Sequence, residues 1–214
     1  MNSAAEPRIL HVIASPRATS RSRAVADSHL DAARQEDPRL RVEELDLWAM
    51  DLPTLDGALL DAKYAILAGK PHQAREAAAW GRVEEITRHF LAFDRYVFST
   101  PMWNLGIPYR LKHYIDVITQ PGLTFSWTRE RGYEGLVHGR SALVAYASAF
   151  DYSAASPLNF WDQQKSFLGT WLRFIGIEDV QAIDCGPTRP GEPRMAEAQA
   201  MAHARAEALA RGGP

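Results

Sequence analysis

Short apolar runs recur along the chain and predict five β-strands. The first run, ILHVIA at 9–14, is rich in β-branched residues and almost wholly apolar, which is typical of a strand buried on both faces. YVFST at 96–100 and RSALVAYAS at 140–148 have the same character. LRVEELDL at 40–47 alternates and indicates a more exposed strand, while DVQAIDC at 179–185 is a weaker fifth run.

Helical periodicity occupies the stretches between these runs. It is found at 20–36, 108–118, 157–175 and 192–211. Ser20 or Ser22 is a candidate N-cap for the first of these helices, and Pro108 stands at the favoured first position of the second. Because parallel neighbours need crossover connections, strands that alternate with helices predict an α/β fold. We expect a doubly wound, five-stranded parallel sheet with helices on both faces.

No internal repeat or low-complexity linker divides the sequence, so we expect one domain over 1–214. Two stretches exceed the minimum that such a sheet requires. Residues 51–92 form a long, partly helical connection before the third strand. Residues 123–137, LTFSWTRERGYEGLV, indicate a short hairpin or lid with Gly132 in its turn.

The composition is that of a globular protein. Hydrophobic residues make up 46% and charged residues 23%, so a substantial core can be buried. The net charge of −2 argues against a dedicated nucleic-acid surface. Cys185 is the only cysteine, which excludes an intrachain disulfide and favours a reducing compartment. The N-terminal MNSAAEPR lacks a signal-peptide core and no run of about 18 apolar residues occurs, so we expect a cytoplasmic protein without membrane insertion.

The loop after the first strand, SPRATSRSR, is rich in hydroxyl and guanidinium groups. Ligands of doubly wound sheets bind beyond the carboxyl ends of the strands, where a helix N-terminus presents unpaired N–H groups to an anion. One serine could simply cap the helix, but the whole cluster favours a phosphate site. The candidate phosphate ligands are Ser15, Thr19, Ser20, Ser22, Arg17, Arg21 and Arg23.

The segment STPMWNLGIP follows the third predicted strand, which puts it at the same edge of the sheet. Met102, Trp103 and Leu105 offer apolar surface, and the amide of Asn104 offers both a donor and an acceptor. Gly106 permits a close approach of the backbone to a ligand. This mixture favours a platform for a flavin ring, although core filling by Trp103 and a turn at Asn104 would explain the same residues.

Motifs for other kinds of site are missing. Neither GxGxxG nor GxxxxGK[ST] occurs, which disfavours a Rossmann dinucleotide loop and a P-loop. The GxSxG of a serine hydrolase is absent as well. The seven histidines form no close pair with ligand spacing and one cysteine cannot build a thiolate site, so we expect no metal. Acidic pairs such as Glu43-Glu44 are expected on solvated faces.

The stretch 101–125, PMWNLGIPYRLKHYIDVITQPGLTF, resembles the signature of the flavodoxin-like NAD(P)H quinone dehydrogenases and FMN-dependent NADH-azoreductases. SPRATSRSR is similar to the phosphate loop of that family, and FLGTWLRFIGIEDV at 167–180 to its penultimate helix and the entry to its last strand. The resemblance implies a flavodoxin-like fold, a tightly held FMN and a homodimer with active sites at its interface. FAD is less favoured, because no added C-terminal segment would hold its adenosine half.

The resemblance also implies cofactor contacts by position. Those to the phosphate are Ser15, Ser20, Arg21 and Ser22, with Arg17 beside them. Those to the isoalloxazine ring are Pro101, Met102, Trp103, Asn104, Leu105 and Gly106. The loop after the fourth strand often reads S-R-G-G in the family, whereas here it is Ala147-Ser148-Ala149-Phe150. Glycines let the backbone approach the ring, whereas Phe150 must stack on it or turn away, so the departure bears on flavin affinity and on the substrate pocket.

The reaction implied by the resemblance is a two-electron transfer from NADH or NADPH, through bound flavin, to a quinone or azo acceptor. The cofactor carries this chemistry, so we expect no catalytic side chain; Tyr133, Tyr152 and His138 are candidate proton sources. Two alternatives stay open. In the first, the chain is an electron carrier, although a carrier has no use for the two inserts. In the second, the chain has lost flavin and serves as a binding or sensor protein.

Overall fold

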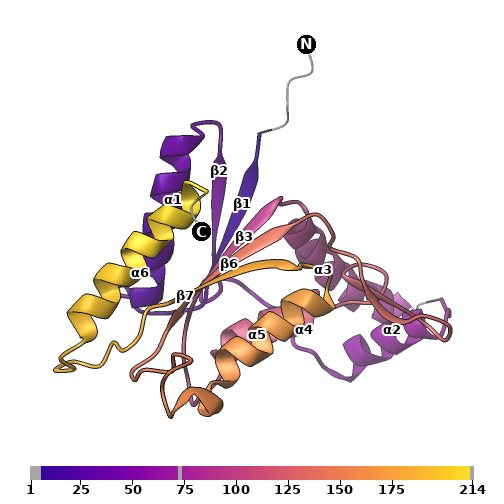
Figure 1. Cartoon of the computed structure of the whole chain (residues 1–214). Helices are drawn as coiled ribbons and strands as arrows, with labels where there is room; N and C mark the ends of the chain where they lie inside the picture. Colours follow the sequence, from indigo (N-terminus) through magenta and orange to yellow (C-terminus); the bar gives the residue numbers. More distant parts are fainter. Residues whose placement is uncertain (1–5, 72–73, 213–214) are drawn as a thin grey trace.

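The main sheet has five parallel strands in the order β2-β1-β3-β6-β7 (Figure 1). A computed structural model describes residues 6–71 and 74–212. The strands are β1 (Arg8–Ile13), β2 (Arg41–Asp46), β3 (Arg95–Pro101), β6 (Ser141–Ala147) and β7 (Asp179–Asp184). The predicted doubly wound α/β fold is confirmed, and each strand coincides with one of the predicted apolar runs.

Helices cover both faces of this sheet (Figure 1). On one face, α1 (Arg21–Glu36) packs against α6 (Met195–Ala210). The other face carries α2 (Gly57–Leu67), α3 (Ala74–Leu91), α4 (Tyr109–Ile118) and α5 (Gln163–Phe174). The four predicted helical stretches correspond to α1, α4, α5 and α6.

The central strands are buried on both sides because successive side chains point to opposite faces of the sheet. In β1, Leu10 and Val12 belong to the hydrophobic cluster under α3, α4 and α5, whereas Ile9 belongs to the cluster under α1 and α6. Among the buried residues of β1, His11 is the polar one, and it is fully buried. The outer strand β2 is largely exposed, as its alternating sequence predicts.

Polar side chains cap the N-termini of α1 and α5, whereas α4 begins after a proline. Ser20 caps α1, because its hydroxyl accepts a hydrogen bond from the backbone N–H of Arg23 at 3.3 Å. Pro108 is the N-cap residue of α4 rather than its first helical residue. The predicted helix at 157–175 is divided, because the carboxylate of Asp162 accepts a backbone N–H bond at 2.9 Å and starts α5 after a short 3-10 turn.

The two extra stretches have regular structure. The connection at 51–92 contains α2 and α3. The stretch 123–137 contains an antiparallel hairpin of β4 (Phe125–Thr128) and β5 (Gly132–Gly135). The hairpin lies close to the end of α5: a Cβ atom on Gly135 would lie 2.3 Å from the backbone nitrogen of Gly176. Only glycine permits this approach.

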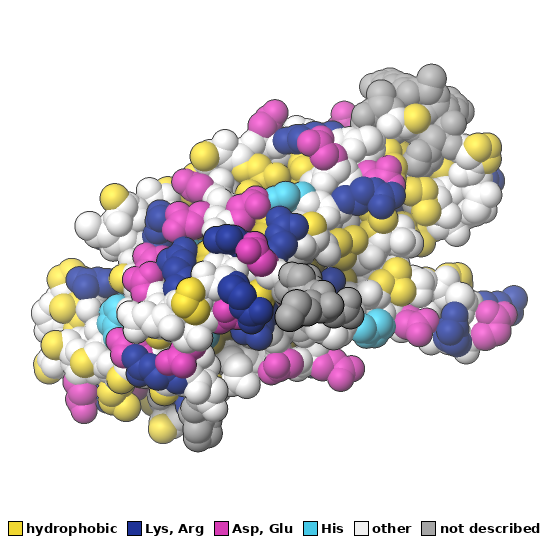
Figure 2. Space-filling view, turned by 90° about the horizontal axis from the view of Figure 1, so that it is seen from above, with side chains coloured by type: hydrophobic (Ala, Val, Ile, Leu, Met, Phe, Trp, Pro, Cys, Tyr) yellow, Lys and Arg dark blue, Asp and Glu magenta, His cyan; other side chains and the backbone are white. Residues whose placement is uncertain are grey.

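Charged side chains of both signs are interspersed over the surface seen in Figure 2. Many of them form ion pairs, such as Arg41 with Glu6 and Arg88 with Glu84. Within the described residues, no helix has both the length and the apolar character that crossing a membrane would require.

Candidate functional site

The loops that follow β1, β3 and β6 meet at one edge of the sheet. The backbone N–H of Met102 donates to the carbonyl oxygen of Ala147 at 2.7 Å, which joins the loops after β3 and β6. The N–H of Thr188 donates to the carbonyl oxygen of Ser148 at 2.9 Å, which adds the segment after β7. Loops that are far apart in the sequence therefore form one continuous rim.

A cavity of about 200 Å³ opens among these loops, and we call it the loop cavity. It is lined by Ser15, Pro16, Arg17, Ser20, Arg21, Pro101, Met102, Trp103, Ala147, Ser148, Ala149 and Thr188. Two of these residues are arginines, and no acidic side chain belongs to the described lining. The N-terminus of α1 adds the positive end of its helix dipole. The loop cavity is therefore suited to an anion.

Ser20 stands at the centre of the hydroxyl cluster. Its side chain is 8% exposed and lines the loop cavity while it caps α1. The hydroxyl of Ser22 lies 3.2 Å from that of Ser20, but Ser22 is 0% exposed and is not part of the lining. Ser22 thus holds Ser20 rather than facing the cavity itself.

The three arginines of this loop have different surroundings. A guanidinium nitrogen of Arg21 donates to the side-chain oxygen of Gln199 at 2.8 Å. Arg23 turns away from the loop cavity and pairs with Glu44 at 2.8 Å. Arg17 lines the cavity and is exposed. Arg17 and Arg21 are therefore the side chains placed to meet an anion there, whereas Arg23 and the exposed Thr19 lie outside the lining.

Trp103 belongs to a cluster of aromatic rings. The centroid of its ring lies 5.6 Å from that of Trp48 and 6.1 Å from that of Tyr109. Trp48 and Tyr109 pack edge to face at 5.4 Å. The indole N–H of Trp48 donates to the carbonyl oxygen of Ala14 at 3.0 Å, so the cluster is anchored to the end of β1.

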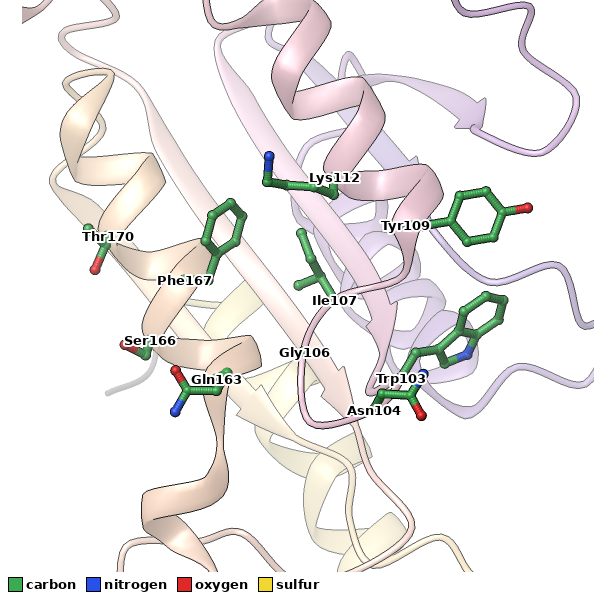
Figure 3. A pocket seen from close by; sticks show the side chains of 10 residues that line it. All are labelled: Trp103, Asn104, Gly106, Ile107, Tyr109, Lys112, Gln163, Ser166, Phe167 and Thr170. Atoms are coloured by element: carbon green, nitrogen blue, oxygen red, sulfur yellow. The ribbon is translucent and has the colours of Figure 1, made fainter.

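A larger cavity of about 680 Å³ lies between α4 and α5 (Figure 3), and we call it the helix cavity. Its lining is Trp103, Asn104, Gly106, Ile107, Tyr109, Lys112, Gln163, Ser166, Phe167 and Thr170. In Figure 3, Lys112 and Phe167 point toward one another, and the ammonium nitrogen lies 5.8 Å from the ring centroid. Trp103 lines both cavities, so the helix cavity adjoins the loop cavity.

Asn104 and Leu105 have a left-handed backbone, with φ of 48° and 71°. Trp103 and Gly106 exchange two backbone hydrogen bonds of 2.9 and 3.0 Å, which close the turn around these residues. Asparagine tolerates a positive φ, whereas leucine rarely adopts it. Asn104 faces the helix cavity and not the loop cavity, and Leu105 lines neither. Strain of this kind is typical of ligand sites.

The altered loop after β6 is tied down by its own hydrogen bonds. The hydroxyl of Ser148 donates to the carbonyl oxygen of Phe150 at 2.8 Å. The ring of Phe150 is 43% exposed and packs with the guanidinium of Arg189 at 5.6 Å. Phe150 thus turns away from the loop cavity, while Ser148 and Ala149 line it.

Several lining residues have no counterpart in the sequence-based prediction. Thr188 follows the fifth predicted strand, so the rule that strand ends meet at one edge could have identified it. The residues of α5 carry no such signal, because only the packing of helices and loops brings them to the site. The candidate proton sources Tyr133, Tyr152 and His138 line neither cavity.

Titratable side chains are sparse in the loop cavity. Apart from Arg17 and Arg21, its described lining contains none. The lone thiol, Cys185, is fully buried, and burial raises its pKa to about 12, so it is not a thiolate near neutral pH. The side chains of the cavity are therefore equipped to bind and orient a ligand, not to act as a strong nucleophile.

Comparison with known proteins agrees with this architecture. A family model described as "Flavodoxin-like fold" matches residues 7–210. The chain is 45% identical over 184 residues to an FMN-dependent NADH:quinone oxidoreductase of Desulfotalea psychrophila, covering 85% of each chain. It is 40% identical over 211 residues to FMN-dependent NADH:quinone oxidoreductase 3 of Pseudomonas fluorescens, covering 95% of this chain and 97% of the relative.

A solved structure gives the same result. The FMN-dependent NADH-azoreductase of Bacillus anthracis, in complex with FMN, superimposes with a TM-score of 0.84 at 26% identity. The superposition covers 96% of this chain and 98% of the azoreductase. The family match, the identity to the relatives and the strand order agree with the resemblance seen in the sequence. This chain therefore belongs to the flavodoxin-like family that includes these FMN-dependent NADH:quinone oxidoreductases.

Proposed function

We propose that this chain is an FMN-dependent NAD(P)H oxidoreductase that reduces quinones, azo compounds or both by two-electron transfer. Its relatives carry these activities in their names and align with most of the chain. The observation that carries the proposal is the junction of two unlike cavities at Trp103: a small one with a positive lining and a larger, more apolar one. A phosphate and a redox-active ring require these two environments.

The loop cavity fits the phosphate end of FMN. Its hydroxyl donors, the N-terminus of α1 and two arginines suit a dianion, and no acidic side chain of the described lining opposes it. In this assignment Ser15, Ser20, Arg17 and Arg21 would hold the phosphate, with Ser22 supporting Ser20. The names of the relatives favour FMN over FAD.

The segments 101–106 and 147–149 would flank the ring system, with Phe150 turned away from it. Trp103 is held by two other aromatic rings, and its turn is closed by two backbone hydrogen bonds, so this wall is preorganised. The amide of Asn104 offers a donor and an acceptor to a polar ring edge. When bound, FMN supplies the redox chemistry: NADH gives up a hydride equivalent and becomes NAD⁺, and a quinone gains two electrons and two protons.

The helix cavity is where nicotinamide and acceptor would bind in turn. Phe167 and Ile107 provide apolar surface for flat molecules, while Lys112, Ser166 and Thr170 add a few polar groups. This combination is typical of small-molecule sites. Side chains here orient the two substrates and exclude water; a proton for the acceptor can come from solvent.

We further propose that the chain works as one domain and forms a homodimer whose interface borders the helix cavity. Large aromatic side chains stand exposed at the start of α4 and just before α5: Tyr109 is 64% exposed, Phe160 is 69% exposed and Trp161 is 49% exposed. Exposed aromatic residues are enriched at protein interfaces. A cytoplasmic location accords with a single cysteine and a structure without disulfides among its described residues.

The proposal is tested by an anaerobic titration of the FMN-loaded protein with NADH, followed through the visible absorbance of the flavin. We expect bleaching at one NADH for each flavin, and reoxidation when a benzoquinone is added. Steady oxidation of NADH in the presence of the quinone would establish that the protein is an enzyme.

Other outcomes would favour the alternatives. A flavin that stays oxidised with both NADH and NADPH indicates an electron carrier. A protein that refuses FMN indicates a binding or sensor role. For the dimer, the mass of the protein in solution is measured by light scattering, and a monomer at micromolar concentration contradicts that part of the proposal.

A further inference from the structure

His11 is a buried histidine whose two ring nitrogens have unlike surroundings. Its side chain is 0% exposed, and its Nε2 lies 3.0 Å from the hydroxyl oxygen of Ser99. Its Nδ1 has no hydrogen-bond partner among the described residues. The nearest acidic group is Asp27, whose carboxylate oxygen lies 3.9 Å from Nδ1. A buried polar atom without a partner calls for an explanation, because it has lost its hydration without compensation.

Two carboxylates stand around this nitrogen. Glu44 lies directly opposite His11 in the register of β1 and β2, and Asp27 comes from the second turn of α1. One ligand atom from each of His11, Asp27 and Glu44 can be chosen so that all three lie within 4.8 Å of one another. None of the three lines the loop cavity or the helix cavity, so the cluster is separate from the flavin site.

We propose that His11 Nδ1, Asp27 and Glu44 form a binding site for a divalent transition-metal ion of the Zn²⁺ type. A nitrogen with two carboxylate oxygens is a donor set that Zn²⁺ accepts, whereas Mg²⁺ prefers oxygen ligands alone. The remaining positions around the ion would be filled by water. Asp27 and Glu44 are 43% and 47% exposed at their side chains, so the ion would approach the site from the side of these carboxylates.

The surroundings of His11 prepare it as a ligand. If Nε2 carries the proton, it donates to Ser99, and Nδ1 keeps an unused lone pair 3.9 Å from a carboxylate oxygen of Asp27. A hydrogen bond from the second ring nitrogen is the arrangement that orients metal-bound histidines. Burial, followed by the charges of Arg23 and Arg34, lowers the pKa of His11 to about 3, so the ring is neutral at pH 7. A neutral imidazole needs no deprotonation before it binds a metal.

Arg23 pairs with both carboxylates of the proposed site. Its Nη2 lies 2.8 Å from a carboxylate oxygen of Glu44, and its Nε lies 3.8 Å from one of Asp27. The guanidinium therefore neutralises the same two carboxylates that would bind the ion. No hydrogen bond joins Arg23 to His11 Nδ1, which has no partner among the described residues. Binding of a metal ion then requires Arg23 to swing out toward solvent.

This competition gives the proposal an unusual test. The FMN-loaded protein is stripped of metal with a chelator and titrated with Zn²⁺ by isothermal calorimetry, in parallel with Asp27→Asn, Glu44→Gln and Arg23→Ala. We expect one Zn²⁺ for each wild-type chain and at least about tenfold weaker binding in Asp27→Asn and Glu44→Gln. We expect tighter binding in Arg23→Ala, because the competing cation is gone. Mg²⁺ at the same concentration should not displace Zn²⁺.

The matched control is Glu43→Gln, which alters the neighbouring carboxylate on β2 and its exposed pair with His89. Its affinity for Zn²⁺ should equal that of the wild type. A fold check by circular dichroism accompanies every variant, and the ¹⁵N shift of His11 Nδ1 in the wild type provides a readout independent of mutation. No binding at millimolar Zn²⁺, unchanged affinity in Glu44→Gln, weaker binding in Arg23→Ala, or an unmoved Nδ1 resonance would each overturn the proposal.

Discussion

The indole rings of Trp48 and Trp103 lie 5.6 Å apart between centroids and tilt by 49°, although one follows β2 and the other follows β3. The strand between them is β1, and the indole N–H of Trp48 donates to the carbonyl oxygen of Ala14 at the end of that strand. Trp48 thus crosses the end of β1 and packs against Trp103. Trp103, which we assign to the flavin ring, is therefore held in place by Trp48, a residue that need not touch the flavin.

Replacing Trp48 with leucine should weaken FMN binding without abolishing it. An aromatic pair contributes about 0.5–1.5 kcal/mol beyond its buried area, which corresponds to a loss of roughly two- to tenfold in affinity. The dissociation constant is measured from the quenching of flavin fluorescence. The control is Trp127→Leu, at an exposed tryptophan of the hairpin that should leave the constant unchanged. Equal effects of the two substitutions would contradict the supporting role of Trp48.

Removing the hydroxyl of Ser20 should distinguish FMN from riboflavin. Ser20→Ala deletes a group that faces the loop cavity, so binding of the phosphorylated ligand should fall by an order of magnitude or more while riboflavin binding changes little. The loss of the N-cap should also lower the free energy of unfolding by about 1 kcal/mol. The double variant Ser20→Ala, Ser22→Ala should bind FMN only slightly more weakly than Ser20→Ala alone, because Ser22 acts through Ser20.

Titrations of FMN and of riboflavin into the same variants show whether Ser20 binds the phosphate. Ser28→Ala, which alters a half-buried hydroxyl of α1 bonded to the carbonyl oxygen of Ala24 and to the ring of His203, serves as the control on the same helix. If Ser20→Ala weakens FMN and riboflavin by the same factor, the loop cavity does not hold the phosphate.

Much of this architecture could be predicted from the sequence, because the relevant signals are local. The apolar run at 9–14 predicts a strand buried on both faces, and Ser20 is one of the two candidate caps of the first helix, the other being Ser22. Strand ends of a parallel sheet lie at one edge, so the loops after β1, β3 and β6 could be assigned to one site before any contact was known.

The remaining features depend on packing between distant elements. Trp48 reaches Trp103 across the end of another strand, and no spacing in the sequence reveals this. His11, Asp27 and Glu44 are far apart along the chain, so a search for closely spaced histidines does not find their cluster. Glu43 and Glu44 are exposed, as expected for an acidic pair on a solvated face, but the pairing of Glu44 with Arg23 depends on how α1 packs beside β2. The direction in which Phe150 turns depends on Arg189.

Two substitutions of Asn104 should separate its backbone from its amide. The left-handed φ of 48° is costly for alanine, by about 1–2 kcal/mol, but not for glycine. Asn104→Ala should therefore be less stable than Asn104→Gly. If the amide contacts the ring, both variants should bind FMN more weakly or shift its reduction potential to a similar extent. Urea unfolding measures the first effect and a spectroelectrochemical titration the second. Wild-type potential and affinity in Asn104→Gly would contradict the contact.

The burial of His11 also makes stability depend on pH. Its folded-state pKa is depressed to about 3, below the ordinary value of 6.5, mainly because burial disfavours the charged ring. A depressed histidine pKa means that the unfolded chain binds a proton that the folded chain does not, so the stability contribution is complete above pH 6.5 and is lost as pH falls toward 3. Burial raises the pKa of the facing Asp27, which has the opposite sign and offsets part of the loss at low pH.

We therefore expect the free energy of unfolding to fall as pH drops from 6.5 to 4.5, with a contribution from His11 that approaches about 1.4 kcal/mol per pH unit. His11→Gln keeps a polar group that can reach Ser99 but does not titrate, so it should be less stable at pH 7 and show a flatter pH dependence. Urea unfolding at several pH values measures both. His203→Gln, at a histidine bonded to Ser28 on the protein's periphery, is the control and should keep the wild-type slope. A slope in His11→Gln equal to that of the wild type would show that the buried ring is not the group that titrates.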